Sequence, residues 1–140
     1  MDTKDYGAEP YVVDIEDLTI SNTAFRVAKW TGKNLQMTVM SIEVGGEVGL
    51  EMHDTHDQFL RIEQGAATVL MGANKDTLTF EQEAHADFAI FVPAGYWHNV
   101  VNSGDEPLKL YSIYAPCAHL KGTIHATYAD AVEAEAAHEH

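Results

Sequence analysis

The sequence predicts an all-β domain, a barrel or a sandwich, followed by one short C-terminal helix. Three observations lead to this fold class. Short apolar segments recur along most of the 140-residue chain, and breaks rich in Gly, Asn and Asp separate them. Many short strands at such spacing are typical of sandwiches and barrels. The last segment differs, because it is rich in Ala and Glu, two good helix formers.

The candidate strands follow one another from residue 25 to residue 114. Leu35, Met37 and Val39 alternate with polar residues, which is the period of a strand with one buried face. The alternation slips near Met40, which indicates a β-bulge there. The predicted strands cover residues 25–30, 35–44, 49–53, 58–64, 67–71, 78–80, 88–92, 97–101 and 108–114.

The C-terminal helix is expected over about residues 126–138, packed outside the barrel. Thr127 precedes Asp130 by three positions, which approximates an N-terminal capping pattern. The length of the chain suits one domain spanning residues 1–140. Cys117 is the single cysteine and cannot form an internal disulfide, so we interpret it as structural.

The strong negative charge narrows the classes of partner. The formal net charge is −14, from 8 Lys+Arg against 22 Asp+Glu. Such a surface repels phosphate backbones and anionic lipids, so we expect no nucleic-acid and no membrane partner. The N-terminus has no apolar core of a secretory signal, and no run approaches the ~20 residues of a membrane span. The expected location is therefore cytoplasmic, and the expected partner is a small-molecule substrate.

Four side chains are candidates for a metal site. Glu51 and His53 are two positions apart on a predicted strand, so both point to one face. Gln58 opens the next strand, and His98 follows a predicted tight turn formed with Pro93. A carboxylate, two imidazoles and an amide oxygen together suit Zn, Fe, Mn or Ni, so the expected cofactor is one divalent metal ion.

The first stretch resembles a motif of the cupin family. That motif is G-x5-H-x-H-x4-E-x6-G, and residues 45–65 read Gly45-x5-Glu51-x-His53-x4-Gln58-x6-Gly65. All five positions are in register, but two of the ligand residues are exchanged. The family's first metal histidine is Glu51 here, and its metal glutamate is Gln58.

The second stretch resembles the other motif of the same family, G-x5-P-x-G-x2-H-x3-N. Residues 87–102 read Asp87-x5-Pro93-x-Gly95-x2-His98-x3-Asn102. The resemblance implies a double-stranded β-helix, the jelly-roll barrel of cupins, and it transfers a ligand role directly to His53 and His98. The roles of the exchanged residues rest on position and chemistry. A metal-free cupin is the alternative, and it requires a closed hydrogen-bond network among the buried donors.

His56 lies in the turn between the two predicted strands and is a possible further ligand, although an exposed turn histidine is the preferred interpretation. We interpret His85, His119 and His125 as surface or core residues. By inward position on the strands, the substrate pocket is expected to be lined by Met40, Leu60, Val100 and Tyr111. The resemblance also implies a homodimer, with residues 11–17 as a candidate arm for exchange.

Three functions remain open at this stage. The first is a metal-dependent isomerase, epimerase or cyclase that acts on a sugar or other small carbonyl compound, with the metal as Lewis acid and Glu51 as a possible catalytic base. The second is a metal-dependent dioxygenase. The third is a non-catalytic binding or sensing module. The fold alone does not decide among them.

Overall fold

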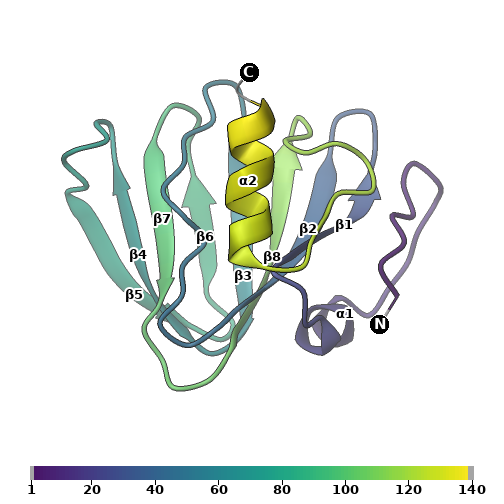
Figure 1. Cartoon of the computed structure of the whole chain (residues 1–140), viewed down its shortest axis with the longest axis horizontal. Helices are drawn as coiled ribbons and strands as arrows, with labels where there is room; N and C mark the ends of the chain where they lie inside the picture. The colour runs from purple at the N-terminus through teal and green to yellow at the C-terminus, as the bar shows by residue number, and fades with distance from the viewer. Residues whose placement is uncertain (1, 139–140) are drawn as a thin grey trace.

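Two antiparallel β-sheets face each other in the computed structural model, which describes residues 2–138 (Figure 1). The strands are β1 Arg26–Thr31, β2 Gln36–Ile42, β3 Asp57–Gln64, β4 Ala66–Gly72, β5 Phe80–His85, β6 Ala89–Val92, β7 Trp97–Asn102, β8 Leu108–Ala115 and β9 Ile124–His125. One sheet has six strands in the order β6-β3-β8-β2-β1-β9, and the other has three in the order β5-β4-β7. This arrangement confirms the predicted all-β class, a double-stranded β-helix.

Strand register decides which side chains enter the space between the sheets. Across β3 and β8, Gln58 pairs with Tyr114 and Leu60 pairs with Ser112. These four side chains are buried in the interior. The alternate positions point outward, so Tyr111 belongs to a second apolar cluster, on the outer face of the larger sheet beneath helix α1 Ile15–Ser21. Both faces of the larger sheet are therefore covered.

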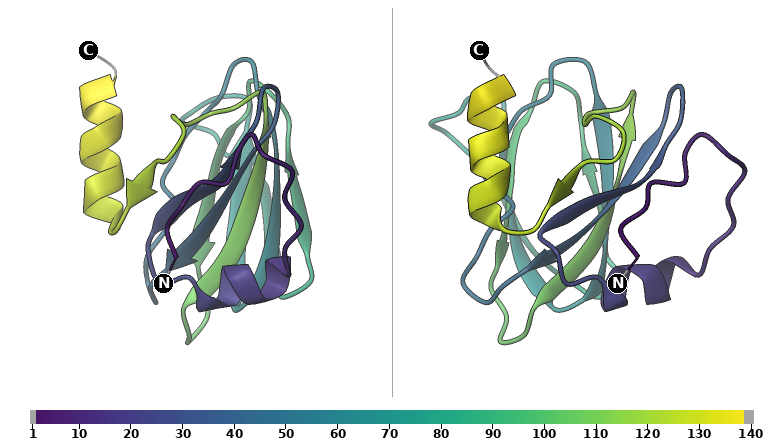
Figure 2. Two further views of the ribbon diagram at one scale, coloured as in Figure 1. Left: turned by 90° about the vertical axis from the view of Figure 1, so that its right-hand side faces the viewer. Right: turned by 45° about the vertical axis from the view of Figure 1, so that its right-hand side comes forward.

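Helix α2 Tyr128–His138 lies outside the barrel wall, as expected (Figures 1 and 2). Its N-terminus is capped reciprocally, because the Asp130 amide donates to Thr127 Oγ1 at 3.1 Å and the Thr127 amide donates to Asp130 Oδ2 at 3.3 Å. Tyr128 packs edge-on against Phe25 with ring centroids 5.5 Å apart, and its hydroxyl lies 3.5 Å from Glu47 Oε1. Through Tyr128, helix α2 thus contacts both the start of β1 and the segment that runs beside β7.

Two predicted strands were placed wrongly. Residues 49–53 form no strand; they follow Gly49, whose positive φ of 107° interrupts the extended backbone. That segment instead joins β7 through isolated bridges, of which one pairs Glu51 with His98. The strand expected at residues 78–80 is β5, which begins at Phe80 and is mostly exposed, so apolar periodicity gave little signal for it.

The bulge expected near Met40 was also wrong. Strand β2 pairs with β8 without a register shift from Gln36 to Ile42, and the alternation slips because both faces of β2 are buried. Helix α1 and strand β9 were not predicted, since they have only seven and two residues. The signal for α1 was Asp14, whose side chain accepts from the Asp17 amide at 3.1 Å.

Candidate metal centre

Three of the predicted donors meet beside the first residues of β7. Glu51 and His98 exchange two backbone hydrogen bonds, of 3.0 and 2.9 Å, which places their side chains on the same side of the pair. Glu51 Oε1 lies 3.6 Å from His98 Nε2 and 3.7 Å from His53 Nε2. One donor atom from each residue lies within 4.8 Å of the other two. Glu51, His53 and His98 therefore form a possible metal-binding triad.

Gln58 enters the same interior from β3. It is 3% exposed, and its Nε2 donates to Ser112 Oγ at 3.4 Å. Its register partner is Tyr114, whose ring centroid lies 5.8 Å from that of His53. The amide oxygen Oε1 of Gln58 has no hydrogen-bond partner among the described residues. Gln58 is therefore the candidate fourth donor.

The donor atoms themselves test whether a cation fits this site. Glu51 Oε1, His53 Nε2, Gln58 Oε1 and His98 Nε2 are all buried, and none has a hydrogen-bond partner within residues 2–138. The closed network that a metal-free site requires is not formed by these residues. Donors about 2.0–2.2 Å from one ion lie roughly 3–4 Å apart, close to the separations of Glu51 from the two histidines. The residues present fit a divalent metal ion.

The carboxyl group of Glu51 is held in its ionised form. Burial alone would raise its pKa, but interactions with His53 and His98 and the charge of Arg26 lower it well below its usual range. A ligand carboxylate must be deprotonated to bind a cation, so this perturbation favours metal binding at neutral pH. Charged donors beside neutral imidazoles suit transition metals better than Ca²⁺ or Mg²⁺.

His56 is not brought into the triad. Its Nε2 lies 2.9 Å from the Cys117 carbonyl oxygen, and its Nδ1 lies 3.2 Å from Thr55 Oγ1. Both ring nitrogens therefore have partners. The ring packs edge-on against His53 with centroids 5.5 Å apart, so His56 supports a donor rather than acting as one.

A cavity of about 580 Å³ opens beside the triad. Leu50, Met52, Trp97 and Leu120 provide much of its apolar lining, and Glu51 and His53 form its polar end. A mostly apolar cavity with a few converging polar groups is the usual form of a small-molecule site. The complete lining is Leu50, Glu51, Met52, His53, Trp97, Cys117, Ala118, His119, Leu120, Thr123, His125, Ala134 and Glu135.

None of the predicted pocket residues lines this cavity. Met40, Leu60 and Val100 point inward as expected, but they belong to the buried apolar core. Tyr111 points away from the interior and packs on the outer face. The prediction took every inward position as a pocket position. The barrel interior around Met40, Leu60 and Val100 is instead filled by side chains. The cavity lies at the other end, where residues 50–53, 117–125 and α2 meet.

Two polar residues of the cavity lining, His119 and His125, were interpreted from the sequence as surface or core residues. Burial and the charge of Arg26 lower the pKa of His119 to about 3 and also lower the pKa of His125. Both imidazoles are therefore neutral at pH 7. The segment that carries them has no strand periodicity, so the sequence offered no signal that it turns toward the barrel mouth.

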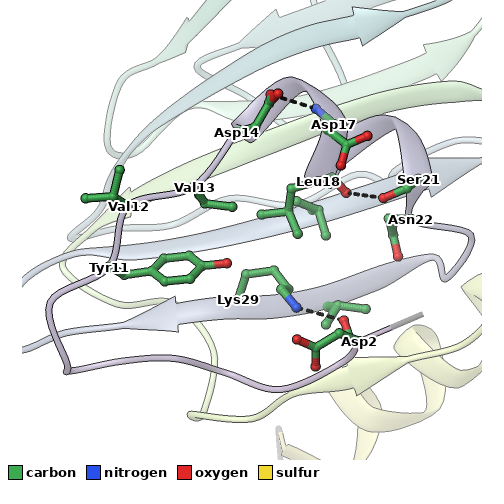
Figure 3. A pocket seen from close by; sticks show the side chains of 12 residues that line it. Asp2, Tyr11, Val12, Val13, Asp14, Asp17, Leu18, Ser21, Asn22 and Lys29 are labelled. Atoms are coloured by element: carbon green, nitrogen blue, oxygen red, sulfur yellow. Dashed lines mark hydrogen bonds between the residues drawn. The ribbon is translucent and has the colours of Figure 1, made fainter.

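A second cavity, of about 440 Å³, lies on the outer face of the larger sheet (Figure 3). The N-terminal arm with Tyr11, helix α1 with Leu18, and Lys29 surround it. Lys29 Nζ donates to the Asp2 carbonyl oxygen at 2.7 Å across it. The sheet separates this cavity from the metal donors, so it is not part of the candidate centre.

Comparison with known proteins identifies close relatives. A family model described as the cupin domain matches residues 38–114. YrkC of Bacillus subtilis is 58% identical over 132 residues, which is 94% of this chain and 71% of YrkC. L612 of Acanthamoeba polyphaga mimivirus is 38% identical over 115 residues, 81% of this chain and 70% of L612. The crystal structure of BH2720 from Bacillus halodurans is 55% identical, with a TM-score of 0.92 and coverage of 93% of this chain and 98% of that one.

Proposed function

The chain belongs to the cupin family, and on that basis we propose that it is a metal-dependent enzyme acting on a small carbonyl compound such as a sugar. The reaction would be of the isomerase, epimerase or cyclase type. The observation that carries this proposal is the convergence of Glu51, His53 and His98 beside a cavity of about 580 Å³. Their facing donor atoms are buried and have no hydrogen-bond partner among the described residues.

Glu51, His53, Gln58 and His98 would hold the ion. A bound divalent metal supplies Lewis-acid polarisation of a carbonyl or hydroxyl oxygen. The cavity lining provides the surroundings of the bound substrate. Met52 and Trp97, the half-buried apolar residues of the lining, limit the contact of a bound substrate with water, which strengthens the electrostatic interactions there.

Two side chains of the site differ in how they hold a proton. The lowered pKa of Glu51 keeps its carboxylate ionised, which suits a metal ligand and makes it a weak base. Burial raises the pKa of Tyr114 to about 12, so its hydroxyl stays protonated behind the ring of His53, which lies 5.8 Å away between centroids.

Elemental analysis of protein purified without affinity nickel tests the proposal. We expect close to one divalent metal per chain in the wild type, and large losses in Glu51→Ala, Gln58→Ala and His98→Ala. His85→Ala is the matched control, because His85 is an exposed histidine at the end of β5 and is not one of the grouped donors. Full metal content in the His98 variant would contradict the ligand set.

The identity of the metal then separates the alternatives. Iron together with oxygen uptake would favour the dioxygenase, whereas a zinc protein would exclude it, since Zn²⁺ has no redox chemistry. Tight ligand binding without turnover would instead identify a sensing module.

Oligomeric state and cellular location stay predictions. No helix within residues 2–138 is long and apolar enough to cross a membrane. The homodimer and the cytoplasmic location remain expectations, and light scattering on purified protein checks the first.

A further inference from the structure

A buried arginine lies behind the cavity wall. Arg26 comes from β1 and is only 1% exposed. Its Nη1 lies 3.3 Å from His125 Nδ1 and 4.0 Å from Glu135 Oε1. Its Nε is buried without a hydrogen-bond partner among the described residues. A guanidinium has five donors, and burying one unpaired is costly, so an unsatisfied donor here indicates a group that the protein alone does not provide.

Two imidazoles and a half-exposed carboxylate surround Arg26. His119 and His125 are neutral at pH 7, and His119 Nε2 is a second buried atom with no hydrogen-bond partner in the part of the chain described. Glu135 forms an ion pair with the guanidinium, in which its Oε1 lies 4.0 Å from Arg26 Nη1, and its side chain is 50% exposed. Solvent screens an ion pair of a half-exposed carboxylate.

A continuous row of rings connects the metal donors with this arginine. Ring centroids are 5.8 Å apart between His53 and Tyr114, 5.3 Å between Tyr114 and His119, and 6.3 Å between His119 and His125. His125 then contacts Arg26 directly. His53, His119 and His125 all line the cavity, so one small ligand can lie along this row.

We propose that Arg26, with His119 and His125 beside it, binds a carboxylate of the substrate, and that the substrate is therefore a small organic acid. Its carboxylate would lie at the Arg26 end of the cavity, and its carbonyl or hydroxyl oxygens would reach the donors around Glu51. The second half of this statement rests on the proposed metal-dependent function, whereas the carboxylate site itself does not.

The charges favour an anion. A divalent ion and the Arg26 guanidinium carry three positive charges against the two negative charges of Glu51 and Glu135, which leaves about one positive charge around the cavity. The guanidinium fork matches the two oxygens of a carboxylate. Among the described residues, the lining of the cavity contains no lysine or arginine of its own, and one guanidinium provides few donors for a dianionic phosphate.

Glu135 stands in the position that an incoming carboxylate would take. It comes from α2, and both Ala134 and Glu135 line the cavity. Arg26, His119, His125 and Glu135 all lie outside residues 38–114, the segment that the family model matches. The carboxylate site is thus built from the parts of this chain that flank the shared cupin segment.

The test observes the Arg26 side chain directly. The Nε–H resonance of Arg26 in the zinc-loaded protein, assigned by its loss in Arg26→Lys, is followed by NMR while acetate, acetamide or inorganic phosphate is added. Acetate should shift this resonance saturably, whereas acetamide, its neutral isostere, should not. In Glu135→Gln the affinity for acetate should rise about two- to fivefold, because a competing carboxylate has been removed. Glu133→Gln, an exposed change on the same helix, should leave it unchanged.

Three results would overturn the proposal: no response of Arg26 to acetate, an equal response to acetamide, or tighter binding of phosphate than of acetate. The metal content of the same samples separates this inference from the proposed function. A protein that binds zinc but shows no acetate response at Arg26 refutes the carboxylate site alone. A protein that responds to acetate but holds no metal refutes the metal centre alone.

Discussion

Removing His98 should abolish the stabilisation that metal gives to this protein. His98 is 1% exposed, its Nε2 has no hydrogen-bond partner within the described chain, and its Nδ1 lies 3.3 Å from the Tyr96 carbonyl oxygen. A ligand that binds only the folded state, at 100 times its dissociation constant, stabilises that state by about 2.7 kcal/mol. For a domain of 140 residues this corresponds to a Tm increase of roughly 8 °C.

Loss of the imidazole weakens this effect in a calculable way. Changes to residues around metal ligands typically weaken metal affinity by 10- to 100-fold, so loss of a ligand should cost at least about 100-fold. At the same free metal concentration the His98→Ala variant would then gain only about 0.4 kcal/mol, or a Tm increase of roughly 1 °C. The variant also loses packing, so the quantity that matters is the metal-dependent increase in Tm and not the absolute Tm.

Differential scanning calorimetry of metal-free and metal-loaded protein measures this increase. Glu51→Gln is a second variant that preserves shape and removes the charge, and it should lose most of the increase as well. His85→Ala should retain the full increase, because His85 is exposed and its Nδ1 contacts only the neighbouring carbonyl at 3.1 Å. If His98→Ala shows the same increase as His85→Ala, the proposed ligand set is wrong.

Three further predictions address stability. In metal-free protein, stability should fall by about 2 kcal/mol between pH 8 and pH 5, because unfolded His119 takes up a proton near pH 6.5 whereas burial and Arg26 lower its folded pKa to about 3. Urea unfolding of His119→Gln across this range should show a smaller loss. Leu60→Ala should lower the free energy of unfolding by about 2–5 kcal/mol in urea, because Leu60 is a packed core residue. A cost below about 1 kcal/mol would show instead that its side chain borders open space. Gly65→Ala should cost about 2–3 kcal/mol, because φ is 97° and an added Cβ would lie 3.2 Å from the Pro107 carbonyl oxygen. Gly45→Ala, with φ of 79° and no atom within 4 Å of the Cβ, should cost only about 1 kcal/mol by the same measurement.

The family and the grouping of the metal donors could be predicted because both depend on local spacing. Glu51 and His53 are only two positions apart, and the turn at Pro93 and Gly95 brings His98 back beside them. Gly95 has a positive φ of 84° and donates its amide to the His53 carbonyl oxygen at 2.8 Å, so this turn also fixes the distance between the two motifs. Short-range backbone geometry was sufficient for these residues.

The cavity could not be predicted in the same way. Strand parity says which side chains point inward, but it does not say whether the interior at that level is filled or open. Leu60 and Val100 point inward and meet other side chains, whereas His119 and His125 come from a segment without regular periodicity. Tertiary structure separates the two groups. Residues 117–125 and α2 border the open end of the barrel, whereas the buried apolar cluster fills the opposite end.

Arg26 shows most clearly where parity and chemistry must be combined. Phe25, Arg26 and Val27 are all buried, so burial does not alternate along this part of the chain, and strand parity does not show that the arginine is enclosed. Its pairing with His125 across β1 and β9 is what directs it toward the cavity. A buried cation on β1 needs an anion to compensate it, and Arg26 is close enough to the metal donors for its charge to lower the pKa of Glu51. Arg26 therefore couples the two ends of the cavity: it favours the ionised ligand at one end and an anionic group at the other.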